Sequence, residues 1–332
     1  MIKNKLIITK TPLRLSFFGG GSDISQFYTN HKSSVISSTI NKYVYVTVKN
    51  HGSLFDEKYR INYQISENTN KKNSIKNNII RECLNFLKID EPLYISTVAD
   101  LPAKSGLGSS SSFTVGLLNA LYSFKGIKVS SGKLAEEASH VEIKLIKSPI
   151  GKQDQYAAAI GGFNKFDFSK EGVKTENLEN IINPNKFFNH LLLFWTGIDR
   201  DTNNILNSVD YRNDHTIRNL VSIVENCNTA YGLIRKDSKK NILKISKLLN
   251  ISWKSKKALS KKISNKKIDK AYKLSIKNGA WGGKIAGAGG GGFLMLMTLP
   301  KYKKRIIKSL KSFKHLPVNF EPHGSALITN DL

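Results

Sequence analysis

Glycines and serines gathered between residues 101 and 124 are the first sign of chemistry in this sequence, which reads LPAKSGLGSSSSFTVGLLNALYSF there. Apolar side chains at Phe113, Leu117, Leu121 and Phe124 recur every three or four positions and predict one buried helix face. A glycine-rich loop therefore leads into a helix N-terminus, whose free N–H groups and positive dipole end favour phosphate. From these residues alone, a flexible serine linker running into a capped helix is the alternative.

Two acidic residues follow this stretch. Glu142 falls late in a helix predicted over 130–147, which Pro149 and Gly151 must end. Asp154 then lies in a second, short helical segment. Helix capping is the ordinary explanation for an aspartate in such a place, and a carboxylate directed into a cleft is the alternative.

A glycine triplet, Gly19 to Gly21, ends a strand predicted over residues 6–18 and is followed by Ser22 and Asp23. Arg14 lies inside this apolar strand, where a charged side chain needs a partner. One interpretation is that the loop holds a polar substrate, with Asp23 accepting hydrogen bonds from hydroxyl groups. The other is a buried ion pair of purely structural importance.

A further glycine run, KIAGAGGGGF over residues 284–293, lies between a predicted helix and an apolar strand. Linkers are seldom bordered so closely by core residues. We therefore expect this backbone to approach another loop or a ligand.

The elements that must position these loops follow from hydrophobic periodicity. Strands are expected over residues 6–18, 35–48, 93–98, 163–168 and 191–196, with a hairpin partner of the second strand over 53–66. Helices are expected over residues 71–88, 113–124, 130–147 and most of the chain from 201 to about 278.

Length and charge restrict the class of protein. The chain of 332 residues fits roughly two domains. Its 52 basic and 25 acidic residues give a net charge of +27, which raises the possibility of nucleic-acid binding. The lysines are scattered among abundant Asn and Ile, however, as a general coding bias would leave them. We expect no nucleic-acid partner and a field that favours anionic substrates.

The apolar runs, the cysteines and the histidines indicate the compartment and the metal chemistry to expect. The apolar runs are short and broken, so no membrane span is expected, and the N-terminal apolar run is too short for a signal peptide. Cys83 and Cys227 are expected as reduced core thiols, and the protein as cytoplasmic. The histidines have no metal-ligand spacing.

Three motifs taken together resemble the GHMP kinases. The first runs from Thr11-Pro12-Leu13-Arg14 to Gly19-Gly20-Gly21-Ser22-Asp23, the second spans residues 102–112 and the third spans residues 284–293. Many members of the family have Gly-Glu-His where this chain has Gly-Gly-Gly-Ser-Asp. This variant, with GKQDQY and GGFN further on, is similar to a branch that phosphorylates sugars.

The resemblance implies roles for individual residues. Asp154 and Arg14 would be catalytic, with Asp154 orienting the sugar hydroxyl or accepting its proton. Ser110 and Glu142 would bind Mg²⁺. The phosphates of ATP would be held by Pro102, Lys104, Ser105, Gly106, Leu107, Gly108, Ser109, Ser110 and Ser111. The substrate would be bound by Arg14, Gly20, Gly21, Ser22, Asp23, Asp154, Gly289 and Gly290. Arg200 joins this set only by its position after a predicted strand, as a candidate for a sugar phosphate.

The resemblance also implies the fold and the reaction. We expect an α+β protein with an N-terminal domain over 1–185, a C-terminal domain over 186–332 and an active site in the cleft between them, each half a mainly antiparallel sheet packed with helices. The expected reaction is ATP- and Mg²⁺-dependent phosphorylation of the anomeric hydroxyl of D-glycero-D-manno-heptose 7-phosphate, for surface polysaccharide synthesis. Fucokinase-like and galactokinase-like kinases, and a non-catalytic nucleotide or sugar sensor, are the alternatives. The partners would be a sugar phosphate and ATP, with a homo-oligomer possible.

Overall fold

The first glycine loop follows β1, a strand of the larger of two sheets. The computed structural model describes residues 5–198 and 202–330, and Arg200 lies outside them. Strands of the larger sheet follow the order β12-β1-β2-β5-β3-β4, with β6 paired to β2 and β7 to β6. Their bounds are β1 (Leu6–Phe18), β2 (Ser33–Asn50), β3 (Tyr59–Asn62), β4 (Ser66–Thr69), β5 (Leu93–Ala99), β6 (Phe163–Ser169), β7 (Gly172–Asn177) and β12 (Ala326–Asn330). The β3–β5 pair is parallel and the other pairs are antiparallel.

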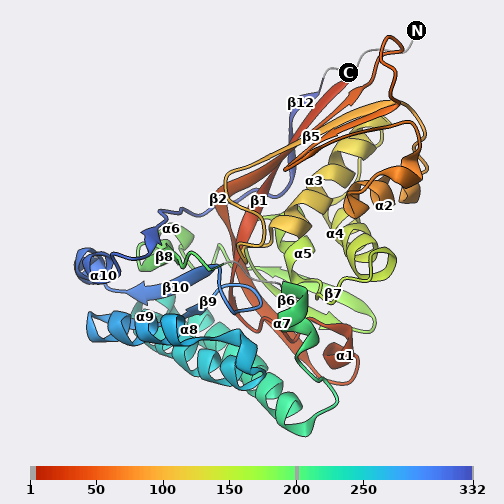
Figure 1. Ribbon diagram of the computed structural model, residues 1–332. Helices are drawn as coiled ribbons and strands as arrows, with labels where there is room; N and C mark the ends of the chain where they lie inside the picture. The colour runs from red at the N-terminus through yellow and green to blue at the C-terminus, as the bar shows by residue number, and fades with distance from the viewer. Residues whose placement is uncertain (1–4, 199–201, 331–332) are drawn as a thin grey trace.

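Helices cover one face of this sheet (Figure 1). They are α2 (Asn78–Phe86), α3 (Ser109–Phe124), α4 (Ser131–His140), which continues into the π-helical turn η2 (Val141–Leu145), and α5 (Gln153–Ile160). The short α1 (Ser25–Tyr28) and η1 (Lys72–Ser74) lie in connections. Because α3 packs between β1, β2 and the helices α4 and α5, it is buried on nearly every side, and not on one face only as the periodicity predicted.

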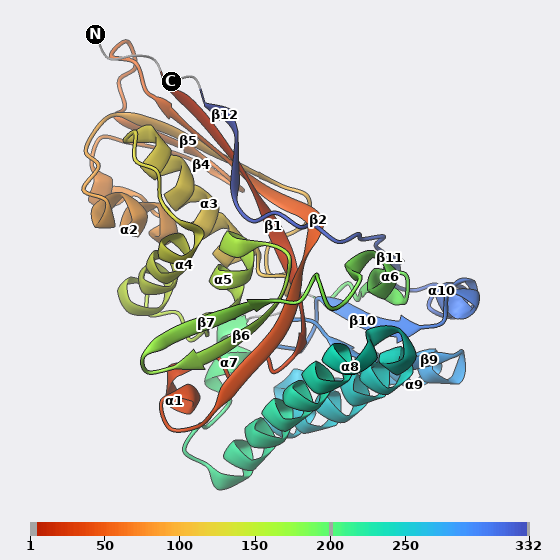
Figure 2. The same cartoon turned by 180° about the vertical axis from the view of Figure 1, so that it is seen from behind.

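The smaller sheet has the order β11-β8-β10-β9, all antiparallel. Figure 2 labels three of its strands, β9, β10 and β11. Its strands are β8 (Leu191–Trp195), β9 (Ala280–Ile285), β10 (Phe293–Thr298) and β11 (Lys314–His315). Its helices are α6 (Pro184–Phe188), α7 (Thr202–Asn207), α8 (Asp214–Ala258), η3 (Lys261–Ile263), α9 (Lys266–Lys277), η4 (Pro300–Tyr302) and α10 (Lys303–Ser309). A non-helical residue, Asp237, interrupts α8. A Cβ on Gly282 of β9 would stand 2.0 Å from the Ser246 carbonyl oxygen, so this glycine lets α8 pack closely on the sheet.

Three expectations about local structure were wrong. The segment 53–66 does not form a hairpin with β2, because β1, β5 and β6 occupy the pairing positions of β2, and β3 pairs with β5 and β4. The helix expected over 71–88 is confined to 78–86 after a single 3₁₀ turn. The third glycine run follows the strand β9, not a helix, and so joins two neighbouring strands.

Cys83 and Cys227 are buried free thiols, as expected, and burial raises the pKa of both. None of the helices in the described ranges combines the length and the apolar character needed to cross a lipid bilayer.

Candidate active site

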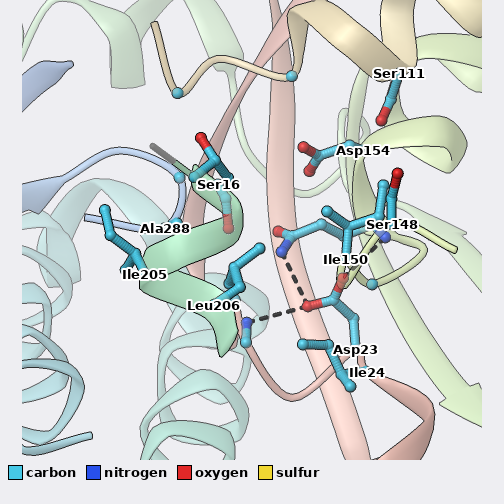
Figure 3. A pocket seen from close by; sticks show the side chains of 18 of the residues that line it. Ser16, Asp23, Ile24, Ser111, Ser148, Ile150, Asp154, Ile205, Leu206 and Ala288 are labelled. Atoms are coloured by element: carbon cyan, nitrogen blue, oxygen red, sulfur yellow. Dashed lines mark hydrogen bonds between the residues drawn. The ribbon is translucent and has the colours of Figure 1, made fainter. Parts of the chain in front are cut away.

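A cavity of about 390 Å³ lies where the three glycine-rich segments meet (Figure 3). The first loop lines it with Gly20, Gly21 and Asp23, the second with Lys104, Gly106 and Gly108 to Ser111, and the third with Gly287 and Ala288. Glu142, Gln153 and Asp154 line one side. Residues of α7 and α8, among them Leu206 and Lys256, line the other. Segments more than 250 residues apart in the chain thus surround one space.

The second loop has the geometry of an anion site. Gly106 and Gly108 have φ of +88° and +83°, which L-amino acids with side chains rarely adopt, and Gly108 caps the N-terminus of α3. Arg14 fixes the loop from β1: its Nη1 donates to the Gly106 carbonyl at 2.8 Å, and its backbone N–H donates to Leu107. The first turn of α3, whose N–H groups have no acceptor within the helix, also lines the cavity.

Arg14 also binds Asp154. Its Nε donates to Oδ1 at 2.7 Å and its Nη2 donates to Oδ2, so the carboxylate is held by two parallel hydrogen bonds. The Arg14 side chain is only 3% exposed, whereas the Asp154 side chain is 24% exposed and faces the cavity. Arg14 therefore pairs with Asp154 and not with Asp23, and Asp154 is the most exposed of the three carboxylates that line the cavity.

Glu142 lines the cavity, is almost fully buried and lies in the π-helical turn η2. Single π-helical turns are frequent at functional sites. Ser110 Oγ donates to Glu142 Oε1 at 2.7 Å, so the predicted pair of metal ligands is in direct contact. Burial raises the pKa of Glu142, while hydrogen bonds from Ser110, Ser111 and Gln155 oppose that rise.

Asp23 is 2% exposed and is held by three donors. Its Oδ1 accepts from the Gly21 N–H at 3.0 Å, and its Oδ2 accepts from the Gln153 N–H at 3.0 Å. The Gln153 side-chain amide completes the set, as the dashed lines in Figure 3 show. Burial raises the pKa of Asp23. A Cβ at Gly151 would stand 2.0 Å from Oδ2, so a glycine at this position lets the carboxylate approach α5.

Profiles of known protein families match both halves of the chain. The GHMP kinases N terminal domain matches residues 76–162, and the GHMP kinases C terminal domain matches residues 231–315. A protein of Campylobacter jejuni named D-glycero-alpha-D-manno-heptose 7-phosphate kinase is 30% identical over 92% of this chain and 94% of its own length. The chain belongs to the GHMP kinase family.

Other relatives agree with this assignment. The L-fucokinase/L-fucose-1-P guanylyltransferase of Bacteroides fragilis is 27% identical over 65% of this kinase but only 23% of its own length. A solved structure from Bacteroides thetaiotaomicron, described as a D-glycero-D-manno-heptose 1-phosphate kinase, has a TM-score of 0.78 at 23% identity and covers 97% of this chain and 99% of its own. That likeness establishes the fold, a mixed α+β architecture with N- and C-terminal domains. The protein is thus an enzyme that transfers phosphate to an alcohol group, and GHMP kinases use ATP as the donor.

Several residues predicted for the site of this kinase do not line the cavity. Ser105 and Leu107 are buried members of the second loop. Ser22 Oγ of the first loop donates to the Gly19 carbonyl. Pro102 is exposed outside the cavity. Gly289 and Gly290 do not line it either, and they pack against Ile263 and Ile205, which do line it. Arg200 falls outside the described residues.

Two buried lysines near the site were missed by the sequence interpretation. Lys284 of β9 is 4% exposed and donates to the Phe17 carbonyl at 3.0 Å. Burial, together with the charges of Lys256 and Arg14, holds the pKa of Lys284 well below its usual value. Lys256 of α8 lines the cavity and donates to the Gly287 carbonyl. A charged residue inside a strand is the signal that could have found Lys284, as it found Arg14.

Proposed function

We propose that this kinase transfers the γ-phosphate of ATP to the anomeric hydroxyl of D-glycero-D-manno-heptose 7-phosphate. The observation that carries the proposal is the Asp154–Arg14 pair, which lines the cavity. Arg14 also binds the Gly106 carbonyl of the second glycine loop, residues 102–111, which we call the phosphate loop. The name of the relative from Campylobacter jejuni supports the choice of acceptor. The product is a sugar 1,7-bisphosphate, which suits a later nucleotide activation for surface polysaccharide.

Asp154 is the group proposed to act on the acceptor. Its carboxylate faces the cavity, where it would accept the hydrogen bond of the sugar hydroxyl and align the oxygen for attack. Arg14 holds both carboxylate oxygens in one plane, which leaves Asp154 one orientation. Phosphoryl transfer depends mainly on such positioning and on stabilising charge.

Magnesium is the metal that the donor set fits. Glu142 offers a carboxylate and Ser110 a hydroxyl, both of them oxygen ligands on the cavity wall and in contact with each other. Mg²⁺ prefers oxygen ligands and takes the rest of its coordination from water and phosphate. When bound, it would neutralise charge on the phosphates.

The phosphates of ATP would be held by the second loop. Gly106, Gly108 and Ser109 to Ser111 line the cavity at the N-terminus of α3, with Lys104 beside them. These backbone N–H groups and hydroxyls would bind the phosphate oxygens and stabilise the charge that develops during transfer.

The acceptor side is proposed to include Gly20, Gly21 and Asp23. The carboxylate of Asp23 has three donors from the protein and capacity for one more, which a sugar hydroxyl would supply. Arg200 remains the proposed contact of the 7-phosphate. The lysine Lys256, on the same cavity, adds positive charge on the side of α8.

A coupled ADP-release assay tests the acceptor, with heptose 7-phosphate, L-fucose, D-galactose and mevalonate compared at equal concentration. We expect turnover with the heptose phosphate to exceed the others by at least about tenfold. A larger rate with fucose or galactose would mean that this other sugar, and not the heptose phosphate, is the acceptor. Absence of turnover with every acceptor, while ATP still binds, supports the sensor instead.

Asp154→Asn separates catalysis from binding. The substitution keeps the shape of the side chain and removes its negative charge. We expect the turnover number to fall by about 10²- to 10⁴-fold, because a positioned acid–base group contributes that much. Nucleotide affinity measured by calorimetry stays within about threefold of the unmutated protein. An unchanged turnover number removes Asp154 from the mechanism.

Partners and location remain expectations of the same proposal. We expect no nucleic-acid partner and no membrane partner. A cytoplasmic location suits an enzyme that uses ATP and a sugar phosphate. Size-exclusion chromatography with light scattering tests the possible homo-oligomer. Weak binding to DNA with a shallow salt dependence is expected from the charge of +27 alone.

A further inference from the structure

Three carboxylates meet at the N-terminus of α5. Asp154 lies in the first turn of this helix, Asp23 comes from the loop after β1, and Glu142 comes from η2. In Figure 3, Asp154 lies between Ser111 of the phosphate loop and Asp23. Burial is the main cause that raises the pKa of Asp23 and of Glu142, and the charge of Asp154 raises both further. Three negative groups this close repel one another unless each is held.

Each of the two outer carboxylates is held by a glutamine next to Asp154 in the sequence. Gln153 Nε2 donates to Asp23 Oδ1 at 2.9 Å. Gln155 Nε2 donates to Glu142 Oε2 at 2.6 Å. In both cases the NH₂ end of the amide faces the carboxylate, whose oxygen accepts the hydrogen bond.

The helical geometry of α5 explains why the side chains of residues 153–155 point in three different directions. Successive side chains of an α-helix are about 100° apart around its axis. Gln153 therefore faces the first glycine loop, Asp154 the cavity, and Gln155 the interior beside η2, where it is fully buried and does not line the cavity. The positions immediately before and after the aspartate thus place the two amides on opposite sides of it.

We propose that Gln153 and Gln155 are positioning residues that divide the work of the site, Gln153 by fixing Asp23 for the acceptor and Gln155 by fixing Glu142 for the metal. This inference rests on the proposed function. An amide suits the task because it donates without carrying charge. A lysine or arginine in the same place would also hold the carboxylate. Its positive charge would, however, compete with Mg²⁺ for Glu142 or with the sugar hydroxyl for Asp23.

Under this proposal, loss of each glutamine amide should weaken a different binding step. Loss of the Gln153 amide frees Asp23 and weakens acceptor binding, with the nucleotide side unchanged. Loss of the Gln155 amide frees Glu142 and weakens the metal, with the acceptor side unchanged. A general loss of structure would instead move both measurements together, in both variants.

The experiment compares Gln153→Met and Gln155→Met, which keep length and remove the amide. The exposed Gln64, between β3 and β4, supplies the control Gln64→Met. Two quantities are measured in the full chain: the KM for heptose 7-phosphate, and the gain in ADP affinity that Mg²⁺ produces, determined by calorimetry without acceptor. Thermal midpoints are recorded for all four proteins.

We expect Gln153→Met to raise the acceptor KM by about tenfold or more and to leave the Mg²⁺ gain within about twofold, because the lost bond goes to a charged group. Gln155→Met is expected to reduce the Mg²⁺ gain by about tenfold or more, as loss of a hydrogen bond behind a metal ligand does, and to leave the acceptor KM within about twofold. If Gln155→Met does not fold, Gln155→Asn keeps the amide but withdraws it by one methylene.

Equal effects of the two variants on both quantities overturn the division, as does a Mg²⁺ gain in Gln155→Met equal to that of the control. Failure of the proposed function is distinguishable, since it appears as absence of turnover with the heptose phosphate in the unmutated protein. The calorimetric measurement needs no acceptor and decides the Gln155 half even then. The Gln153 half is then measured with whichever sugar the unmutated protein phosphorylates, and a substrate panel without any active acceptor overturns it.

Discussion

At the scale of single residues, Arg14 connects the two proposed halves of the reaction. One guanidinium binds the Gly106 carbonyl of the phosphate loop and both oxygens of Asp154. Because it is almost fully buried, its charge is offset mainly by Asp154, and the position of each group depends on the other. Only a planar fork of donors can make all three contacts at once.

Arg14→Lys therefore tests geometry at constant charge. A lysine has a single ammonium group and cannot reach Gly106 and both carboxylate oxygens together. We expect kcat to fall by at least about tenfold and the free energy of unfolding to fall by about 2 kcal/mol or more, since a buried pair is weakened. Arg212→Lys, at an exposed ion pair, serves as the control in the same urea titration and the same assay. A variant with unchanged kcat contradicts the role of the fork.

Asp23 gives a prediction about pH. Its folded-state pKa is raised above the ordinary 3.8 by burial, so between those two values the folded protein holds a proton that the unfolded chain has lost. The contribution of Asp23 to stability thus falls as pH rises through that window and is constant above it. Relative to Asp23→Asn, which has no such proton, the unmutated protein should lose stability over this window. Urea unfolding of both proteins in half-unit steps from pH 4 measures the difference, and a difference that is flat or of opposite sign contradicts the assignment.

Much of the site could be predicted at this scale, and the reason differs between residues. Arg14 and Asp23 were found because charges next to apolar strands and glycines need partners, and Glu142 and Asp154 because a motif contains them. Gln153 and Gln155 have no such signal, since a neutral amide next to a helix start is ordinary. Their importance depends on which carboxylates the fold places beside them.

At the scale of elements, the second and third glycine loops are in contact. A Cβ on Gly292 would stand 2.3 Å from the Ser105 carbonyl oxygen, and Gly292 has a φ of +77°. The backbone of the loop between β9 and β10 therefore packs directly against the proposed phosphate loop. This contact is the close approach that the sequence predicted for residues 284–293, made to another loop.

Gly292→Ala tests this support, with Gly126→Ala as a matched control. Gly126 has a φ of +73°, and a Cβ added there would meet no atom of the described residues within 4 Å, so it shares the backbone strain without the clash. Strain alone costs about 1–2 kcal/mol in either variant. We expect Gly292→Ala to lose at least about 2 kcal/mol more and to weaken ADP binding, and Gly126→Ala to bind ADP normally. Equal stability losses in a thermal-shift comparison contradict the contact.

Elements were predicted best where one segment alone decides them. The strands β1, β2, β5, β6 and β8 lie close to the expected ranges because alternation and flanking glycines are local signals. The hairpin expected at 53–66 does not form because other strands compete for the same pairing positions. Strand β5 pairs with β2, and β3 pairs in parallel with β5. The helix α3 is buried all round because other helices cover it, which its own sequence does not reveal.

At the scale of the whole molecule, Lys284 joins the two sheets. It belongs to β9 of the smaller sheet and donates to Phe17 of β1 in the larger one. Its charge is disfavoured by burial and by the neighbouring Lys256 and Arg14. Burying a cation in this way costs stability. We therefore expect the charge of Lys284 to serve activity, through its field on the anionic ligands of the cavity.

Lys284→Met should separate stability from activity. The thioether keeps the length of the side chain and removes the buried charge. We expect a thermal midpoint equal to or above that of the unmutated protein, and a fall of at least about tenfold in kcat/KM. Lys277→Met, at an exposed position on α9, should change neither. A large fall in the midpoint together with normal kcat/KM would mean that the lysine serves the fold alone.

Strand β12 returns to the larger sheet and so limits where the chain can be cut into separate fragments. β12 pairs with β1 along the edge of the larger sheet, and Thr11 Oγ1 and Ser325 Oγ lie 2.8 Å apart beside it. The chain thus leaves the larger sheet after β7, builds the smaller one and returns. A fragment that stops at the proposed boundary of 185 would expose an unpaired strand edge and tend to associate with other copies. Recombinant dissection is better attempted by excising the middle of the chain and joining residue 185 to the returning tail with a short flexible linker.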